Sequence, residues 1–359
     1  MEKPQRATMP IRVLYYIPGS DLSEREELYH HGIYRGEMVY GAFQLSKQGL
    51  SVVQIKPLRN WQGKWSRIWY AFYLLFKSRH YDVIYSPYYS GLEYAIKLRG
   101  LRSFPRKIVI WHHNPVKRDK RLLGRIAQKW FYHGCDALLF FSDAIREESL
   151  LAGLNIREKS FVLNWGPDMS FYDKIRQPYQ SGGGIFMSGL DSRDFDTLLI
   201  VCEKLPEQKF TIVPPDAETA NKFEKCKNVT LLRYIRAFES YYQVALETAK
   251  ASLVLILTKP INGRNLPSGL TSICEATGLA KPCIITKNRF FSQELLNAGF
   301  ASFVEVGDVD DICKQIKVLV KDEETCSRMS NAALTYARQY DINNMSLQLA
   351  DIIKRIIHK

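Results

Sequence analysis

The stretch that decides the fold is Lys259-Pro-Ile-Asn-Gly-Arg264-Asn-Leu-Pro267-Ser268-Gly269-Leu-Thr-Ser-Ile-Cys-Glu275-Ala-Thr-Gly-Leu-Ala-Lys281-Pro282. An apolar segment precedes it, so we expect a buried strand that runs into a polar loop and then into a helix. Ser268 is the expected N-cap, and Gly269 allows close approach to its backbone. The free amides around Ser268, Gly269 and Leu270 would then face an anion such as a diphosphate.

Glu275 lies two turns into the same expected helix. A carboxylate at this position is suited to accept hydrogen bonds from two ribose hydroxyls. An ordinary strand, loop and helix with a surface glutamate fits the same residues, because capped helices are common.

A second strand, glycine turn and helix start occurs at residues 184–195. It contains Gly189 in the turn and places Arg193 at the same end of the expected sheet. Arginine grips phosphate oxygens with paired N–H groups. The alternative is a surface arginine near a helix start, where the helix dipole disfavours a cation.

The alternation of strands and helices extends through both halves of the chain. Strands are expected at 11–17, 51–55, 82–85, 107–111, 137–141 and 160–163, and then at 185–188, 209–213, 228–232, 252–258, 282–286 and 302–305. Helices are expected at 35–48, 64–78, 120–133, from 142 onward, and at 194–204, 237–249, 269–279, 291–297, 308–320, 323–339 and 343–357. Short apolar strands between amphipathic helices predict parallel sheets covered on both faces.

Two doubly wound, Rossmann-like α/β domains facing a cleft are therefore expected. Gly166-Pro167-Asp168 and the polar residues up to Gly184 have the composition of a linker. The expected divisions are a flexible N-terminus at 1–10, a first domain at 11–168, a linker at 169–184, a second domain at 185–340 and a C-terminal helix at 341–359 that packs back on the first domain. Ligands of such sheets bind beyond the carboxyl ends of the strands.

The composition of this 359-residue chain is that of a globular protein with two cores. Its seven cysteines form no C-x-x-C pair, which predicts reduced thiols and a cytoplasmic location. We expect neither a signal peptide nor a transmembrane helix, because no apolar run approaches ~18 residues. Of the net charge of +13, residues 1–180 carry +12, from 28 Lys and Arg against 16 Asp and Glu, so this half suits an anionic partner.

Three enzyme classes are disfavoured because their sequence motifs are missing. No G-x-G-x-x-G follows a strand, as a nicotinamide enzyme would need, and G-x-x-x-x-G-K-[ST] and G-x-S-x-G are absent.

Segments from both halves resemble the family-4 retaining glycosyltransferases (glycosyl transferases group 1), most strongly over residues 184–345. That family carries a glutamate, seven residues, a second glutamate followed by Ala, and then a Gly-Lys-Pro-Val-Ile strand. The matching segments are Glu275-Ala276, Ala280-Lys281-Pro282-Cys283-Ile284-Ile285, Val306-Gly307-Asp308 with Asp311-Ile312, and, in the first half, Ser142, Gly153 and Asn164-Trp165-Gly166-Pro167-Asp168.

The resemblance implies a GT-B fold and a donor sugar linked to UDP or GDP. It implies that Glu275 holds the donor ribose and that Arg193, at the position of a family lysine, steadies the diphosphate. His112, with His113 beside it, matches a family histidine near the reacting sugar and would position that sugar. The implied reaction retains configuration by front-face attack, with the leaving phosphate taking the proton of the acceptor.

Two glycines are expected where a backbone approaches the donor closely. Gly189 follows the first strand of the second half, and Gly32 lies in the loop 29–36 that the resemblance brings to the donor phosphate and acceptor. A simple turn explains Gly32 equally well.

The sequence also departs from the family pattern. Pro267 stands where the first glutamate is usual, and Leu190 stands where an arginine commonly follows the strand glycine. These residues weaken the expectation for the donor sugar and admit a catalytically degenerate protein. Lys259 or Arg264 is a candidate for the missing cation.

We expect neither a metal nor a cofactor. The Asp-x-Asp triplets at 194–196 and 308–310 have a form that binds a divalent metal in another class of glycosyltransferase, but both lie at expected helix starts, where Asp caps amides. The pairs His30-His31 and His112-His113 have no i, i+4 histidine or cysteine partner of the kind that zinc needs.

Tryptophans alternate with cations between residues 59 and 72. This composition suits a water–lipid interface and predicts docking on an anionic membrane or a lipid-linked acceptor. The residues concerned are Trp61, Lys64, Trp65, Arg67 and Trp69. A core helix with basic edges is the alternative, and single-stranded nucleic acid, which uses similar residues, is disfavoured because no nucleic-acid module is recognisable.

The sequence thus predicts a cytoplasmic, metal-independent, hexosyltransferase-like enzyme, peripheral on the cytoplasmic face of a membrane. Its expected partners are a nucleotide sugar and a glycan or lipid-linked glycan acceptor, in cell-surface polysaccharide biosynthesis. A degenerate protein that binds a nucleotide sugar or a partner enzyme, and a nucleotide-sugar epimerase, are the alternatives.

Overall fold

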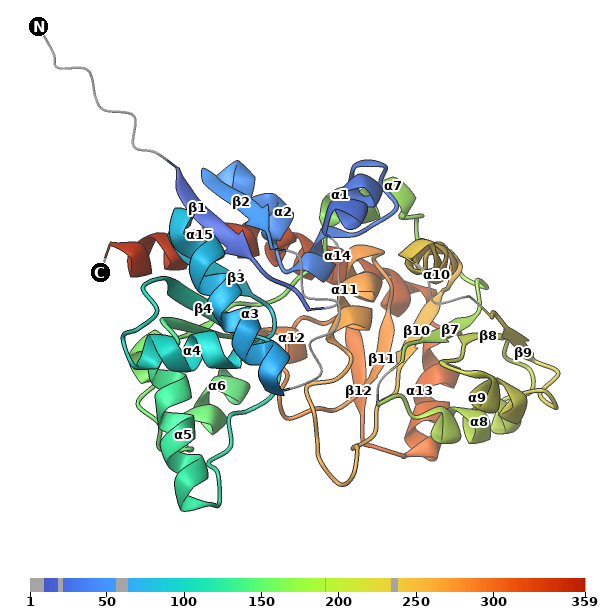
Figure 1. Cartoon of the computed structure of the whole chain (residues 1–359). Helices are drawn as coiled ribbons and strands as arrows, with labels where there is room; N and C mark the ends of the chain where they lie inside the picture. Colours follow the sequence, from blue (N-terminus) through green and yellow to red (C-terminus); the bar gives the residue numbers. More distant parts are fainter. Residues whose placement is uncertain (1–9, 19–21, 56–63, 191, 234–237, 359) are drawn as a thin grey trace, which may run out of the picture. The chain divides into compact units, whose positions relative to one another are not determined.

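A computed structural model describes residues 10–358, with the exception of 19–21, 56–63, 191 and 234–237. The chain divides into two compact units (Figure 1). Unit 1 comprises residues 1–24, 38–164 and 343–359, and unit 2 comprises residues 25–37 and 165–342. Each unit contains one six-stranded parallel sheet, so the expected α/β class with two Rossmann-like domains is confirmed.

The sheet of unit 1 has the strand order β2-β1-β3-β4-β5-β6. Its strands are β1 (Ile11–Tyr15), β2 (Leu50–Gln54), β3 (Val83–Ser86), β4 (Lys107–His112), β5 (Ala137–Phe140) and β6 (Ser160–Val162). Its helices are α2 (Ala42–Leu45), α3 (Lys64–Lys77), α4 (Glu93–Gly100), α5 (Leu122–His133), α6 (Asp143–Leu150) and α15 (Ile342–Ile357). Every residue of β3 and β5 is buried, as in a parallel sheet covered on both faces.

The sheet of unit 2 has the strand order β12-β11-β10-β7-β8-β9. Its strands are β7 (Ile185–Ser188), β8 (Phe210–Val213), β9 (Val229–Leu231), β10 (Leu253–Ile256), β11 (Cys283–Thr286) and β12 (Ala301–Val304). Its helices are α7 (Met169–Ile175), α8 (Phe195–Lys204), α9 (Ala217–Lys222), α10 (Phe238–Lys250), α11 (Leu270–Gly278), α12 (Gln293–Leu296), α13 (Val309–Leu319) and α14 (Glu323–Gln339), while α1 (Leu22–His30) begins in unit 1 and ends in unit 2.

The two faces of the second sheet carry separate cores because successive side chains of a strand point to opposite sides. Ile185 and Met187 pack with apolar residues of α8 and α13. Phe186, between them, packs in another cluster with residues of α11 and α14. The helix starts and loops that follow the strands therefore collect at the carboxyl edge of a rigid sheet.

The division of the chain differs from the expected one in two places. The expected linker at 169–184 contains α7, whose Phe171 and Tyr172 pack against Ala245, Ala249 and Leu279 of unit 2, so its apolar side chains make it part of that unit. Residues 25–37 belong to unit 2 although the strands on either side of them belong to unit 1. The expected N-terminal segment 1–10 lies outside the described residues except for Pro10.

Two further expectations concern helices of unit 1. The helix expected at 35–48 is broken into short turns because Tyr40 and Gly41 have left-handed φ values of 53° and 77°. The expected packing of the C-terminal helix on the first domain is confirmed, since residues 343–359 belong to unit 1 and a β-carbon at Gly41 would lie 3.0 Å from Cε of Met345. Within the described part of the chain, no helix combines the length and the apolar character that a membrane span requires.

Candidate functional site

The start of α11 lies at the carboxyl edge of the second sheet, after the loop 257–269 that follows the buried strand β10. The N-cap is Gly269, with φ of 97° and no side-chain hydrogen bond to the helix amides. The expected N-cap, Ser268, is one residue too early, because the chain must turn through a left-handed conformation that glycine adopts without strain. Leu270 is the first helical residue, so the amides of the first turn have no side-chain acceptor at the cap.

Other helices of unit 2 begin differently. Side-chain oxygens of Asp194, Asp216, Asp308 and Asp322 accept hydrogen bonds at the starts of α8, α9, α13 and α14. The start of α11, where the sequence predicts an anion site, lacks such a side-chain cap. Its first backbone amides can therefore donate to a bound anion.

Arg193 lies beside this helix start. Its Nη2 donates to Oγ of Ser272, in the first turn of α11, at 2.7 Å, and its Nε donates to the carbonyl of Ser188 at 2.9 Å. The residue is only 9% exposed. Gly189, with φ of 128°, lies under the guanidinium, and a β-carbon there would be 2.7 Å from Cζ of Arg193. The structure thus brings Gly189, Arg193 and the start of α11 together, as the sequence predicted.

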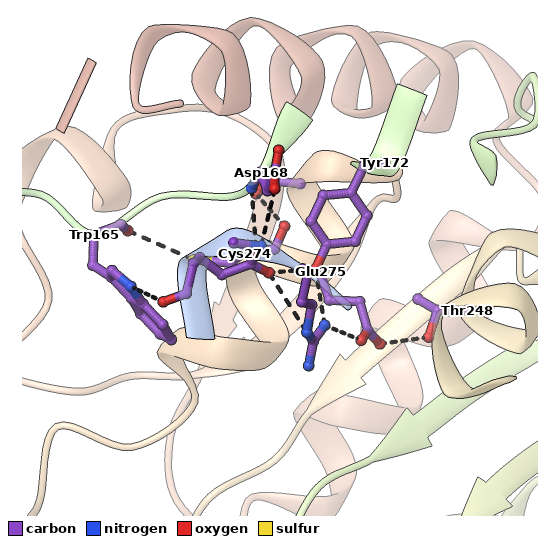
Figure 2. A network of polar contacts seen from close by, with 10 residues as sticks. Trp165, Asp168, Tyr172, Thr248, Cys274 and Glu275 are labelled. Carbon is purple, nitrogen blue, oxygen red and sulfur yellow. Dashed lines mark hydrogen bonds and ion pairs between the residues drawn. The ribbon is translucent and has the colours of Figure 1, made fainter. Parts of the chain in front are cut away.

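Glu275 is part of a buried polar network of unit 2 (Figure 2). One carboxylate oxygen accepts a hydrogen bond from Arg35 at 2.5 Å, and the other accepts one from Thr248 at 2.7 Å. The side chains of Arg35 and Glu275 are 5% and 6% exposed. A carboxylate has about four lone-pair positions, so these partners leave two unused. The ribose role of Glu275 stays a prediction.

The same network ties residues 35–37 to the start of α7. Tyr172 accepts from Arg35 and donates to Glu37, both at 2.8 Å, and the second oxygen of Glu37 accepts from the amide of Asp168 (Figure 2). The amide of Gly36 in turn donates to Asp168. Burial raises the pKa of the Glu37 carboxyl to about 7, although Arg35 opposes the shift. This group therefore titrates near neutral pH.

Gly32 lies in the turn that follows α1, within unit 2. It has φ of 73°, and its amide donates to the carbonyl of Tyr29 at 2.9 Å. A β-carbon there would lie 3.3 Å from Nζ of Lys174. The left-handed turn by itself explains why residue 32 is a glycine. The approach of Gly32 to a sugar donor stays a prediction.

Both Asp-x-Asp triplets begin helices, as expected. Asp194 accepts from the amide of Thr197 and Asp308 from that of Asp311. Asp196 instead forms ion pairs with Lys222 and Lys259. Lys259, a candidate for a missing donor-site cation, is thus engaged by carboxylates.

His112 ends β4 in the first sheet, among aromatic rings. Its ring lies 5.6 Å from that of Phe140 and 6.0 Å from that of Tyr89. The residue is 5% exposed, and its Nε2 has no hydrogen-bond partner among the described residues. Burial and the neighbouring His113 lower the pKa of His112 to about 3, so the imidazole is neutral at physiological pH. A buried orphan nitrogen at the carboxyl edge of a sheet is the feature that an incoming hydroxyl would satisfy.

His113 extends this cluster towards the surface. Its ring stacks on Tyr88 with centroids 4.6 Å apart, and its Nε2 lies 2.8 Å from the hydroxyl of Tyr40. Tyr88 and Tyr89, which follow β3, are 38% and 47% exposed. The carboxyl edge of the first sheet thus presents aromatic faces beside His112.

The remaining predicted residues belong to α3 and its approach. Trp65 and Trp69 are exposed on α3 of unit 1. Lys64 and Arg67 are on the same helix, where the structure describes only their backbone, and Trp61 lies outside the described residues.

The sequence analysis did not identify Arg35, Glu37, Tyr172, Thr248 or Ser272 as functional. No motif joins them, because Arg35 and Glu275 are 240 positions apart. The only local signal is the charged pair Arg35-Gly36-Glu37 between apolar residues, which indicates buried charges that need partners.

The chain was compared with protein-family models, curated proteins and solved structures, and only solved structures match it. No protein-family model matches the chain, and the sequence search of curated proteins found no match. Among solved structures, sucrose-phosphate synthase from Thermosynechococcus elongatus matches with a TM-score of 0.68 at 13% identity, over 97% of this chain and 99% of that one. HepE from Anabaena, in complex with UDP-glucose, matches with a TM-score of 0.63 at 16% identity, over 96% of this chain and 100% of that one.

A third match is a putative UDP-N-acetylglucosamine 2-epimerase from Listeria monocytogenes, with a TM-score of 0.59 at 13% identity, over 96% of each chain. At these identities the similarity concerns the fold alone. Two six-stranded parallel sheets in tandem, matched over nearly the whole length of the chain, identify the fold of this protein as GT-B.

Proposed function

We propose that the chain is a glycosyltransferase that takes a sugar from a nucleoside-diphosphate donor. The observation that carries the proposal is the contact of Arg193 with the first turn of α11, at the uncapped start of that helix. The structure of HepE, with which the chain shares its fold, contains UDP-glucose. Arg193 and the amides after Gly269 together offer a diphosphate a guanidinium and a helix N-terminus.

The chemistry of transfer explains why these groups are needed. Cleavage of the anomeric C–O bond leaves its electron pair on the departing diphosphate. Preorganised positive groups that face the developing charge stabilise the transition state. Arg193 and the helix start supply this charge without requiring a divalent metal, which supports a metal-independent reaction.

In the proposed retaining reaction, the acceptor hydroxyl attacks from the face that the diphosphate leaves, and its proton passes to the departing phosphate oxygen. His112 is neutral and its Nε2 has no protein partner among the described residues, so it would position a sugar hydroxyl. Glu275 would accept ribose hydroxyls through its unused lone pairs. Both roles rest on the family resemblance and on this geometry.

A non-catalytic nucleotide-sugar-binding protein is the second candidate. Pro267 precedes the helix start where the family resemblance expects a glutamate, and both oxygens of Glu275 already have protein partners. Binding of a donor without turnover would support this candidate, and the epimerase-like fold match adds conversion of the donor sugar as a third product to monitor.

The test is a panel of UDP- and GDP-sugars, first by thermal shift and then by release of the nucleoside diphosphate in EDTA. We expect one donor to raise the melting temperature and to be consumed without added metal. Arg193→Ala should weaken donor binding at least about tenfold and lower both effects accordingly. Arg328→Ala, which removes an exposed arginine of α14 in the same unit, is the matched control and should preserve them. Full activity of Arg193→Ala would refute the site assignment.

A further inference from the structure

Unit 1 exposes an apolar stripe along α3. Trp65, Trp69, Phe72 and Phe76 are spaced four, three and four residues apart, which places them on one face of the helix. Trp65 and Trp69 are 75% and 71% exposed, and Phe72 and Phe76 are 55% and 59% exposed. The opposite face, with Tyr70 and Leu74, is buried against the unit. The helix is thus apolar towards solvent as well as towards the core.

A second exposed apolar stripe occurs on α5. Leu122, Leu123, Ile126 and Trp130 also follow helical spacing, and Leu123 and Trp130 are 80% and 50% exposed. The sequence predicted a helix at 120–133 but not an exposed apolar face on it.

The two stripes belong to one layer of helices. α4 packs against both α3 and α5, and Figure 1 shows the three helices on the same side of the first sheet. α4 and the end of α5 approach closely, since a β-carbon at Gly134 would overlap the carbonyl of Ile96. The two stripes are therefore held on a common rigid support.

The charges along both helices and their flanks are almost all positive. Residues 64–80 contain four Lys and Arg and no Asp or Glu, and residues 117–133 contain six Lys and Arg and one Asp. At the end of α3, the guanidinium of Arg79 lies 4.3 Å from the ring centroid of Phe76. Lys117, Arg118, Lys120, Arg121 and Lys129 are exposed beside the α5 stripe. Aromatic rings bordered by cations are typical of a water–lipid interface with anionic headgroups.

We propose that the stripes of α3 and α5 form one docking surface for an anionic lipid bilayer. Tryptophan, phenylalanine and leucine side chains would enter the headgroup region, while the bordering lysines and arginines pair with lipid phosphates. This surface extends the docking expected for residues 61–69 to a second helix. The docking surface does not depend on the proposed donor site, because none of its residues belongs to the start of α11 or contacts Arg193.

The charges decide against two other occupants. If two copies of the chain met through this surface, the ten Lys and Arg of one copy would face the ten of the other. The single Asp on each side would do little to offset the repulsion. Single-stranded nucleic acid stacks its bases on aromatic rings, whereas the exposed α5 stripe is mostly aliphatic, with Leu122, Leu123 and Ile126.

The experiment is co-sedimentation of the full chain with vesicles of phosphatidylcholine, with and without phosphatidylglycerol. We expect binding to the anionic vesicles, weak binding to pure phosphatidylcholine, and loss of binding at high salt. Tryptophan emission should shift to shorter wavelength with anionic vesicles only.

One double variant tests each stripe: Trp65→Ser with Trp69→Ser for α3, and Leu123→Ser with Trp130→Ser for α5. Each should lower the partition coefficient by about tenfold or more, because each removes two inserted side chains. Leu151→Ser with Leu347→Ser is the matched control. It removes two exposed leucines of unit 1, one directly after α6 and one on α15, and should bind like wild type.

Unchanged circular dichroism and an unchanged thermal shift with the nucleotide sugar would show that the variants fold and keep the donor site. Equal binding to neutral and anionic vesicles would overturn the proposal, as would equal binding by the control and both stripe variants. An α5 variant that binds like wild type would remove α5 from the surface. Self-association that the stripe variants abolish, without vesicle binding, would assign the surface to a second copy.

Discussion

At the scale of single residues, Arg193 is fixed before any ligand binds. Ser188 and Ser272 each accept one of its N–H groups, and the residue is nearly buried. A cation at a helix start is unfavourable in isolation, because the dipole there is positive. This unfavourable position is consistent with the proposal that Arg193 binds an anion.

Gly189→Ala tests this arrangement. A β-carbon at this position would overlap the guanidinium of Arg193, and the φ of 128° is strained for alanine. We expect the affinity for the nucleotide sugar to fall about 10- to 100-fold, because the displaced arginine would lose one charge-assisted hydrogen bond to the ligand. Calorimetric titration measures it. Gly182→Ala, with φ of 85° and no atom within 4 Å of the added carbon, is the control for backbone strain. Equal affinities of the two variants would contradict the prediction.

Glu37 gives the fold a dependence on pH. Its pKa in the folded protein is about 7, against 4.5 for an ordinary glutamate. Between these values the folded state keeps a proton that the unfolded state has released, so stability falls as pH rises. Relative to Glu37→Gln, the wild type should lose about 2–3 kcal/mol of unfolding free energy between about pH 5 and pH 8. Urea unfolding across this range measures the difference, and parallel pH curves would refute it.

At the scale of elements, residues 25–37 form an insertion from the first strand connection into unit 2. Arg35 holds this segment through Glu275 of α11 and Tyr172 of α7, while Gly36 bonds to Asp168. The segment and α11 are thus parts of one buried network. Sequence analysis could not find this, since apolar periodicity carries no information about which buried charges meet.

Arg35→Met should release the segment. The variant leaves the carboxylates of Glu37 and Glu275 buried without their cation, which costs about 3–5 kcal/mol of unfolding free energy. Protease should then cleave within residues 25–37 faster than in the wild type. Arg233→Met breaks an exposed pair with Glu224 and should cost at most about 1 kcal/mol. Similar losses in both variants would show that the buried pair has no special role.

At the scale of the whole molecule, the strands were predictable, whereas the membership of residues 25–37 and 169–184 in unit 2 was not. The twelve strands found among the described residues occur where apolar segments recur, because both faces of a parallel sheet are buried. The short helices α1, α4, α7 and α9 were not predicted, since fewer than three turns give little periodicity. The meeting of Arg193 with α11 was predictable because the carboxyl ends of parallel strands share an edge. The pairing of Arg35 with Glu275, and the exposure of the α5 stripe, required three-dimensional packing.

The central claim is that Arg193 and the start of α11 hold the diphosphate of a sugar donor. The measurement is calorimetric titration of the wild type, Arg193→Ala and Arg328→Ala with the nucleotide sugar selected from the panel. We expect Arg193→Ala to lose at least about tenfold in affinity, as for one charge-assisted hydrogen bond, while Arg328→Ala binds like wild type. Equal dissociation constants for all three proteins would contradict it.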